Sequence, residues 1–149
     1  MKRPVCQTDI MPQDGYAPVL FTVDRADRAL VLVRRIVSDV VEGYRRLMDL
    51  QEEIEIAQAD SAERQRAQEE LADLVIRLQT CLEELEDVGV ELRDFSRGVV
   101  DFPCLVDGRV AYLCWELGEP TVAYWHELGE GFAERQPVLT KAKTLAARP

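Results

Sequence analysis

The residues best suited to chemistry are concentrated near the C-terminal end of the chain. His126 is the only histidine and is followed directly by Glu127. Cys114 precedes this pair and Arg135 follows it. An imidazole beside carboxylates can transfer protons or bind a metal ion, and an arginine can clamp a carboxylate or phosphate. We therefore place any ligand site in this part of the chain.

Metal binding has weak support from the spacing of these residues. The run His126-Glu127-Leu128-Gly129-Glu130 is similar to the H-E-x-x-H motif, but it ends in Glu, and Gly129 disfavours a helix. In one register of the predicted strands, Cys114 and His126 become diagonal neighbours, roughly 7 Å apart at Cβ. A mononuclear site of Cys, His and a carboxylate is thus one alternative to a His126 that hydrogen-bonds a nearby carboxylate or backbone group. The four cysteines form no C-x-x-C pair (Cys6, Cys81, Cys104 and Cys114). We therefore predict no bound metal. The sequence does not identify a cofactor.

Other polar and aromatic candidates lie close to His126 in the sequence. Trp115 and Trp125 can stack on a ligand, although such residues more often pack in a core. An internal ion pair of Arg135, for example with Asp101 or Glu127, is the main alternative to ligand binding by Arg135. Two further charged candidates lie in turns or at strand ends (Arg97 and Glu119).

Two long helices precede these residues. Thr22 or Asp24 can cap the first helix, and apolar residues then recur at alternating spacings of three and four. This pattern places Tyr44 and Gln51 in the seam between the helices. The predicted helices cover about 24–58 and 61–88, and the short turn between them makes them antiparallel neighbours.

After Gly89 the hydrophobic period changes from 3.6 to 2, which is typical of β-strands. Asp107-Gly108 is a strong hairpin signal, and Pro103 suggests a sheet edge or a bulge. We predict three or four short strands in a meander. The fold class is therefore α+β: a long antiparallel helical hairpin, coiled-coil-like, with a small antiparallel β meander at its base. We expect a single domain over 1–149, with an arm (1–20), the hairpin (22–88), the β module (90–137) and a tail (138–149).

Four motifs together resemble one known family. They are Leu20-Phe21-Thr22-Val23 before a long helix, 98–103 (GVVDFP), 112–119 (YLCWELGE) and 124–137 (YWHELGEGFAERQP). These motifs are similar to domain of unknown function family 2203, a group of uncharacterised prokaryotic proteins. Gly129 stands where the family pattern has an acid, and Glu134 where it has a glycine. The resemblance implies the fold class and brings no known activity.

Charge and hydropathy exclude several functions for the chain. It has 28 acidic and 18 basic residues, for a formal net charge of −10. Such a surface repels phosphate backbones and anionic membranes, so we predict neither nucleic-acid nor membrane binding, and we consider a nucleic-acid accessory role the weakest hypothesis. No stretch approaches the roughly 20 apolar residues of a membrane span, and no apolar run follows the N-terminus. We expect a cytoplasmic protein.

Two functional hypotheses remain from this sequence. In the first, the protein is a non-enzymatic interaction or scaffolding module that forms a homodimer or larger symmetric oligomer through its hairpin, with a further protein partner possible. The motivation is a wide apolar stripe on the first helix, with Ile36 and Leu50 on one flank and Val41 and Met48 on the other. In the second, it binds a small molecule or metal, or is an enzyme, through a site in the β module. Convergence of the polar side chains on one concave site favours the second hypothesis, and separate pairing favours the first.

Overall fold

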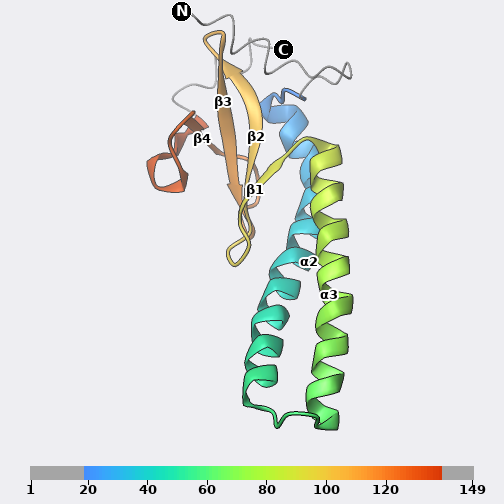
Figure 1. Cartoon of the computed structure of the whole chain (residues 1–149). Coiled ribbons are helices and arrows are strands. Elements are labelled where there is room, and N and C mark those ends of the chain that lie inside the picture. The colour runs from blue at the N-terminus through green and yellow to red at the C-terminus, as the bar shows by residue number, and fades with distance from the viewer. Residues whose placement is uncertain (1–18, 139–149) are drawn as a thin grey trace, which may run out of the picture.

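The computed structural model describes residues 19–138. The predicted arm up to residue 18, with Cys6 in it, and the tail from residue 139 lie outside the described residues. Within them, two long helices are followed by a small sheet at one end of the helical hairpin, and the α2–α3 turn projects away from that sheet (Figure 1). The predicted α+β architecture is confirmed.

The two helices begin and end where local sequence signals place them. Helix α2 spans Val23–Ile56, and the side chain of Thr22 accepts a hydrogen bond from the Arg25 amide at its start. Helix α3 spans Ala62–Val88 and is capped in the same way by Ser61. Gly89 ends α3 with φ of 102°, a left-handed conformation that glycine adopts without steric cost.

The contact between the helices is rotated from the predicted seam. Leu50 is fully buried, whereas the adjacent Gln51 is exposed. Gly43 lies against Leu74 and Leu78 of α3, so the predicted seam position of Tyr44 is wrong by one residue. Tyr44 contacts the ring of Phe95 instead, with 5.6 Å between the ring centroids. The cause is the β1–β2 loop, which occupies the face of α2 that the heptad pattern assigned to α3.

Over residues 19–138, five antiparallel strands form a meander in the order β1-β2-β3-β4-β5. They span β1 Glu91–Asp94, β2 Val99–Val106, β3 Arg109–Glu116, β4 Tyr124–Glu127 and β5 Gln136–Pro137. The predicted turn at Asp107-Gly108 joins β2 to β3, and both residues have positive φ, as a two-residue hairpin requires. The sequence pattern predicted neither the short β5 strand nor the 3₁₀ helix Phe132–Glu134.

Pro103 lies within β2, a strand that has neighbours on both sides. It is tolerated because β1 pairs only as far as Asp101, so β2 is an edge strand at Pro103. On the other side, Pro103 pairs with Tyr112 of β3. Its carbonyl also accepts a hydrogen bond from the Phe21 amide at 2.7 Å, which ties the start of the hairpin to the sheet.

The sheet packs on α2 through the apolar residues of one face. The rings of Phe21 and Phe102 meet edge to face, with 5.1 Å between centroids. The loop at Gly98 lies against Val37 and Val41 of α2. Val41 is therefore only 8% exposed, so the expectation that it forms an exposed patch with Met48 is wrong for Val41. Met48 is 48% exposed, and Ile36 and Leu50 on the other flank are buried.

Neither described helix has an apolar segment long enough to cross a lipid bilayer.

Candidate functional site

Side chains on the sheet alternate between an apolar face and a polar face. On β2 and β3, Val100, Phe102 and Leu113 are buried on the side of α2. The alternate residues Asp101, Tyr112 and Cys114 lie on the opposite side, which we call the outer face. The pairing of β4 adds two more residues to the outer face, Tyr124 opposite Cys114 and His126 opposite Tyr112.

Three ionisable side chains meet on the outer face. Asp101 and Cys114 are directly opposite each other on β2 and β3, and His126 is diagonal to Cys114 on β4. The carboxylate, thiol and imidazole atoms lie within 4.8 Å of one another. Asp101 and His126 are each 2% exposed and Cys114 is 0% exposed. We call these residues the buried polar cluster; the diagonal register that the sequence analysis considered is the one adopted.

Both ring nitrogens of His126 face hydrogen-bond acceptors. Nδ1 lies 2.9 Å from the carbonyl oxygen of Glu127, and Nε2 lies 3.1 Å from each carboxylate oxygen of Asp101. A carbonyl can only accept, so Nδ1 carries a proton and donates it. Nε2 then faces Asp101 either with a second proton or with a lone pair. In neither state is a ring nitrogen free to act as a general base on a substrate.

Arg93 holds the carboxylate of Asp101 and lies over the ring of Tyr112, although the sequence analysis proposed neither as a site residue. Arg93 Nε donates to Asp101 Oδ2 at 2.8 Å, and its guanidinium also pairs with Glu91 at 2.6 Å. The same guanidinium lies 5.0 Å from the centre of the Tyr112 ring, which in turn lies 5.6 Å from the His126 ring. One signal was available in the sequence, because Tyr112 is two residues from Cys114 and so shares its face.

Cys114 is protonated and unreactive in this environment. Burial, reinforced by the neighbouring Asp101, raises the pKa of its thiol to about 12, and Arg135 opposes the shift only in part. A nucleophilic cysteine needs a lowered pKa and some exposure, and Cys114 has neither. The arrangement therefore does not support nucleophilic catalysis by this thiol.

Arg135 is fixed by an ion pair and by two aromatic rings. Its guanidinium pairs with Glu119 through both carboxylate oxygens, and the NH1–Oε1 contact is 3.2 Å. It lies 3.8 Å from the centre of the Phe132 ring and 4.0 Å from that of Tyr124. The expected internal ion pair is thus present, but the partner is Glu119 because the turn after β3 brings that carboxylate to the outer face.

A pocket of about 520 Å³ opens on the outer face beside the cluster. Its floor includes Asp101 and Tyr112, and the loop at residues 128–132 forms one wall. Arg97 stands at the rim, 4.2 Å from the centre of the Phe132 ring, and pairs with Glu116 at 3.1 Å. The Arg, Asp and Glu residues that line the pocket are Arg93, Arg97, Asp94, Asp101 and Glu130.

Gly129 and Glu134, which the sequence analysis expected to depart from the family pattern, lie in or beside this wall. Gly129 has φ of 82°, a conformation that an acidic residue would adopt only with strain. The side chain of Glu134 accepts a hydrogen bond from the Gly131 amide at 2.7 Å and so caps the start of the short 3₁₀ helix Phe132–Glu134. Both residues suit the loop conformation of this chain.

The remaining sequence candidates do not join the cluster. Trp115 and Trp125 are buried in the core, and Trp115 Nε1 donates to the carbonyl of Glu119 at 2.9 Å. The carboxylate of Glu127 pairs with Arg109 at 2.9 Å, and only its backbone carbonyl serves His126. The structure thus brings three of the nine candidates together in the cluster and places Arg135, with its partner Glu119, beside it. The other four lie in the core or in separate ion pairs (Trp115, Trp125, Arg97 and Glu127).

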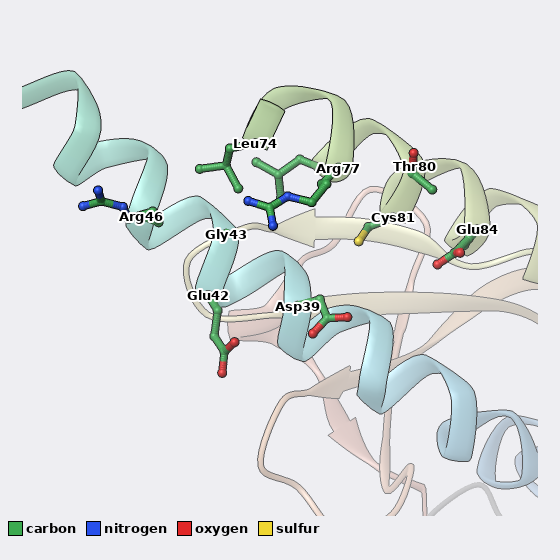
Figure 2. A pocket seen from close by; sticks show the side chains of 10 residues that line it. Asp39, Glu42, Gly43, Arg46, Leu74, Arg77, Thr80, Cys81 and Glu84 are labelled. Atoms are coloured by element: carbon green, nitrogen blue, oxygen red, sulfur yellow. The ribbon is translucent and has the colours of Figure 1, made fainter. Parts of the chain in front are cut away.

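A second hollow, of about 580 Å³, lies along the helical hairpin. Figure 2 shows Arg77 reaching from α3 towards Gly43, where α2 has no side chain. Arg46, also in its lining, is held by Glu53 and Glu70 at 3.0 and 2.8 Å. The acidic and basic groups here are solvated along the helices and do not converge on a buried point.

Fold and site together define an α+β protein in which a helical hairpin supports a β meander with a buried polar cluster on its outer face. The family of uncharacterized conserved proteins called DUF2203 has a model that matches residues 19–138, and the chain belongs to this family. No curated protein and no solved structure matches the chain.

Proposed function

We propose that this protein binds a small ligand, with the site on the outer face of its sheet. The observation that supports the proposal is the convergence of Asp101, Cys114 and His126 beside an open pocket. Buried ionisable groups are costly to a fold unless they are paired or serve a function. Here three of them share one point on a sheet whose other face already supplies the core.

The alternative role as a pure interaction module has less support. It requires the polar residues of the β module to be paired off separately, and it requires a wide apolar patch on α2. Arg97, Glu127 and Arg135 are paired separately, but the convergence of the three cluster residues departs from the first condition. Burial of Val41, Ile36 and Leu50 within the chain reduces the patch. Oligomerisation through the hairpin stays a separate prediction, and it is compatible with ligand binding at the other end of the molecule.

Binding is proposed here without a catalytic role. Both ring nitrogens of His126 are directed at acceptors, and the pKa of Cys114 lies far above neutral pH. Acid–base and nucleophilic mechanisms each need a group that is free to react. The arrangement instead resembles a rigid recognition surface, with Arg93 and Tyr112 as its accessible elements.

Native mass spectrometry with elemental analysis of protein purified without chelators tests the proposal. We expect a mass excess over the bare chain that disappears under denaturing conditions. The Asp101→Asn variant should lose this excess, while Glu52→Gln on the exposed surface of α2 should keep it. A bare-chain mass for both wild type and Glu52→Gln would contradict ligand binding.

A further inference from the structure

The buried polar cluster offers one oxygen, one sulfur and one nitrogen atom to a common point. Asp101, Cys114 and His126 lie on three neighbouring strands, and their donor atoms are within 4.8 Å of one another. Because strand pairing fixes all three backbones, the donors are positioned before any ligand arrives. Such preorganisation is what a metal site needs and what isolated surface carboxylates lack.

The hydrogen bonds of His126 orient one nitrogen towards this point. Nδ1 donates to the backbone carbonyl of Glu127 at 2.9 Å, which leaves Nε2 directed at Asp101. Histidines that bind metals through Nε2 commonly donate Nδ1–H to a backbone carbonyl or carboxylate. The same arrangement also fits a protonated imidazole paired with Asp101. The two states differ in whether a proton or a metal ion lies between Nε2 and the carboxylate.

Two arginines lie beside Asp101 and Cys114, and the Cys114 thiol releases its proton to solvent when a metal ion binds. Arg93 donates to Asp101 Oδ2 at 2.8 Å, so an outer residue already orients the carboxylate. Arg135, held by Glu119, lies beside Cys114. Outer partners of this kind hold donor groups in place and support negative charge on them.

We propose that Asp101, Cys114 and His126 bind one transition-metal ion of the Zn²⁺ type. This inference rests on the proposed function, because it names the ligand of the same site. A mixed nitrogen, sulfur and oxygen donor set suits Zn²⁺ or Co²⁺ and does not suit Mg²⁺ or Ca²⁺, which prefer oxygen ligands. The linear spacing predicted no metal site because whole strands separate the three residues in the sequence.

A tetrahedral ion requires the three donor atoms, which lie within 4.8 Å of one another, to close by up to about 1 Å. With bonds of about 2.0–2.3 Å to nitrogen, oxygen and sulfur, tetrahedral donors lie roughly 3.3–3.6 Å apart. The Nε2–carboxylate distance of 3.1 Å is a few tenths of an ångström shorter than this range. Three protein ligands leave a fourth position open, and the pocket that includes Asp101 and Tyr112 is the space into which that position can open.

Titration of chelator-treated protein with CoCl₂ tests this inference, since Co²⁺ replaces Zn²⁺ in such sites and is coloured. We expect one Co²⁺ per chain, with visible d–d absorption and a near-ultraviolet thiolate-to-cobalt charge-transfer band, both abolished by added Zn²⁺. Cys114→Ala should remove the charge-transfer band, and His126→Gln should weaken Co²⁺ binding at least tenfold. Cys104→Ala, which removes a buried thiol from the opposite face, is the matched control and should retain both bands.

The titration of wild-type protein alone decides whether the chain binds one metal ion, so this result does not depend on the folding of any variant. Absence of stoichiometric Co²⁺ and Zn²⁺ binding by folded wild-type protein would overturn the metal assignment, as would a charge-transfer band that survives Cys114→Ala. If metal binding fails while native mass spectrometry still detects a ligand that Asp101→Asn loses, only the metal assignment falls. If neither measurement detects a ligand, both proposals fall.

Discussion

At the scale of single residues, the environment of His126 determines what this chain can do. A lone histidine is often regarded as a general base, but here strand β4 directs Nδ1 at a backbone carbonyl and Nε2 at Asp101. Asp101 in turn accepts from Arg93. These three residues form a hydrogen-bonded network, and the loss of Asp101 leaves the buried His126 ring without its partner at Nε2.

Removal of the Asp101 carboxylate should be strongly destabilising. The Asp101→Ala variant leaves Nε2 of His126 and the guanidinium of Arg93 without their shared acceptor. Breaking a buried charged pair from one side costs about 3–5 kcal/mol, so we expect a loss of about 3 kcal/mol in the free energy of unfolding, measured with urea. Glu116→Ala, which removes the partially exposed partner of Arg97, should cost less than about 1 kcal/mol. Equal losses would contradict the buried network.

Cysteine reactivity should follow burial. Burial raises the pKa of Cys104 to about 12, so at pH 8 roughly one thiol in ten thousand is ionised. Cys81, on the hairpin, is only partly buried. We expect iodoacetamide to modify Cys81 well before Cys104, as measured by peptide mass spectrometry. Urea that unfolds the protein should abolish the difference. Faster labelling of Cys104 in the folded state would be inconsistent with this burial.

At the scale of elements, the β1–β2 loop decides how sheet and hairpin fit together. Gly98 has φ of 77°, and a Cβ added there would lie 2.9 Å from Val37 Cγ1 and from Leu117 Cβ. This close approach is possible only for glycine. It allows the loop to cover Val41, and it explains why the face of α2 near Tyr44 contacts Phe95 and not α3.

Comparison of Gly98→Ala in the β1–β2 loop with Gly108→Ala in the β2–β3 turn separates the cost of packing from the cost of backbone strain. Gly98 and Gly108 have nearly equal φ values of 77° and 78°, but nothing lies within 4 Å of a Cβ built on Gly108. Gly108→Ala should therefore cost only the left-handed strain, about 1 kcal/mol. Gly98→Ala should add a steric term and cost about 3 kcal/mol in total. Similar unfolding free energies for the two variants would show that the loop does not pack tightly on α2.

At the scale of the whole molecule, the hairpin projects from the β module and carries exposed apolar residues. Val31 and Ile56 on α2 and Ile76 on α3 are among them. Exposed apolar side chains on a projecting helix pair are typical of an association surface when they are contiguous. The apolar stripe on α2 that the sequence pattern indicated is narrower in the folded chain, because the β1–β2 loop covers part of it.

The expected homodimer is testable by sedimentation equilibrium at micromolar concentration. We expect about twice the chain mass of 16.9 kDa and a shift towards monomer for Met48→Glu, because a carboxylate would be buried in the interface. Val41→Glu is unsuitable, since Val41 is buried within one chain. Leu128→Glu, at an exposed apolar position on the β module, is the control and should remain dimeric. A monomer mass unaffected by Met48→Glu would contradict association through the hairpin.

Much of the architecture could be predicted from the sequence because its causes are local. The caps at Thr22 and Gly89, the helical periodicity between them and the turn at Asp107-Gly108 each act over a few residues. The family motifs supported the same arrangement. The sequence also indicated the β module as the place for a ligand site, because that is where His126, both Trp residues, Cys114 and Arg135 lie.

Only the tertiary structure decided which of those residues meet. Asp101, Cys114 and His126 are brought together by strand register, and a shift of one residue in the pairing of β3 with β4 would send His126 to the opposite face. The roles of Arg93 and Tyr112 follow from the same register. Likewise, the rotation of the helix seam from Tyr44 to Gly43 results from competition between α3 and the β1–β2 loop for one face of α2. Contacts between distant segments depend on packing across the whole chain, which local periodicity does not encode.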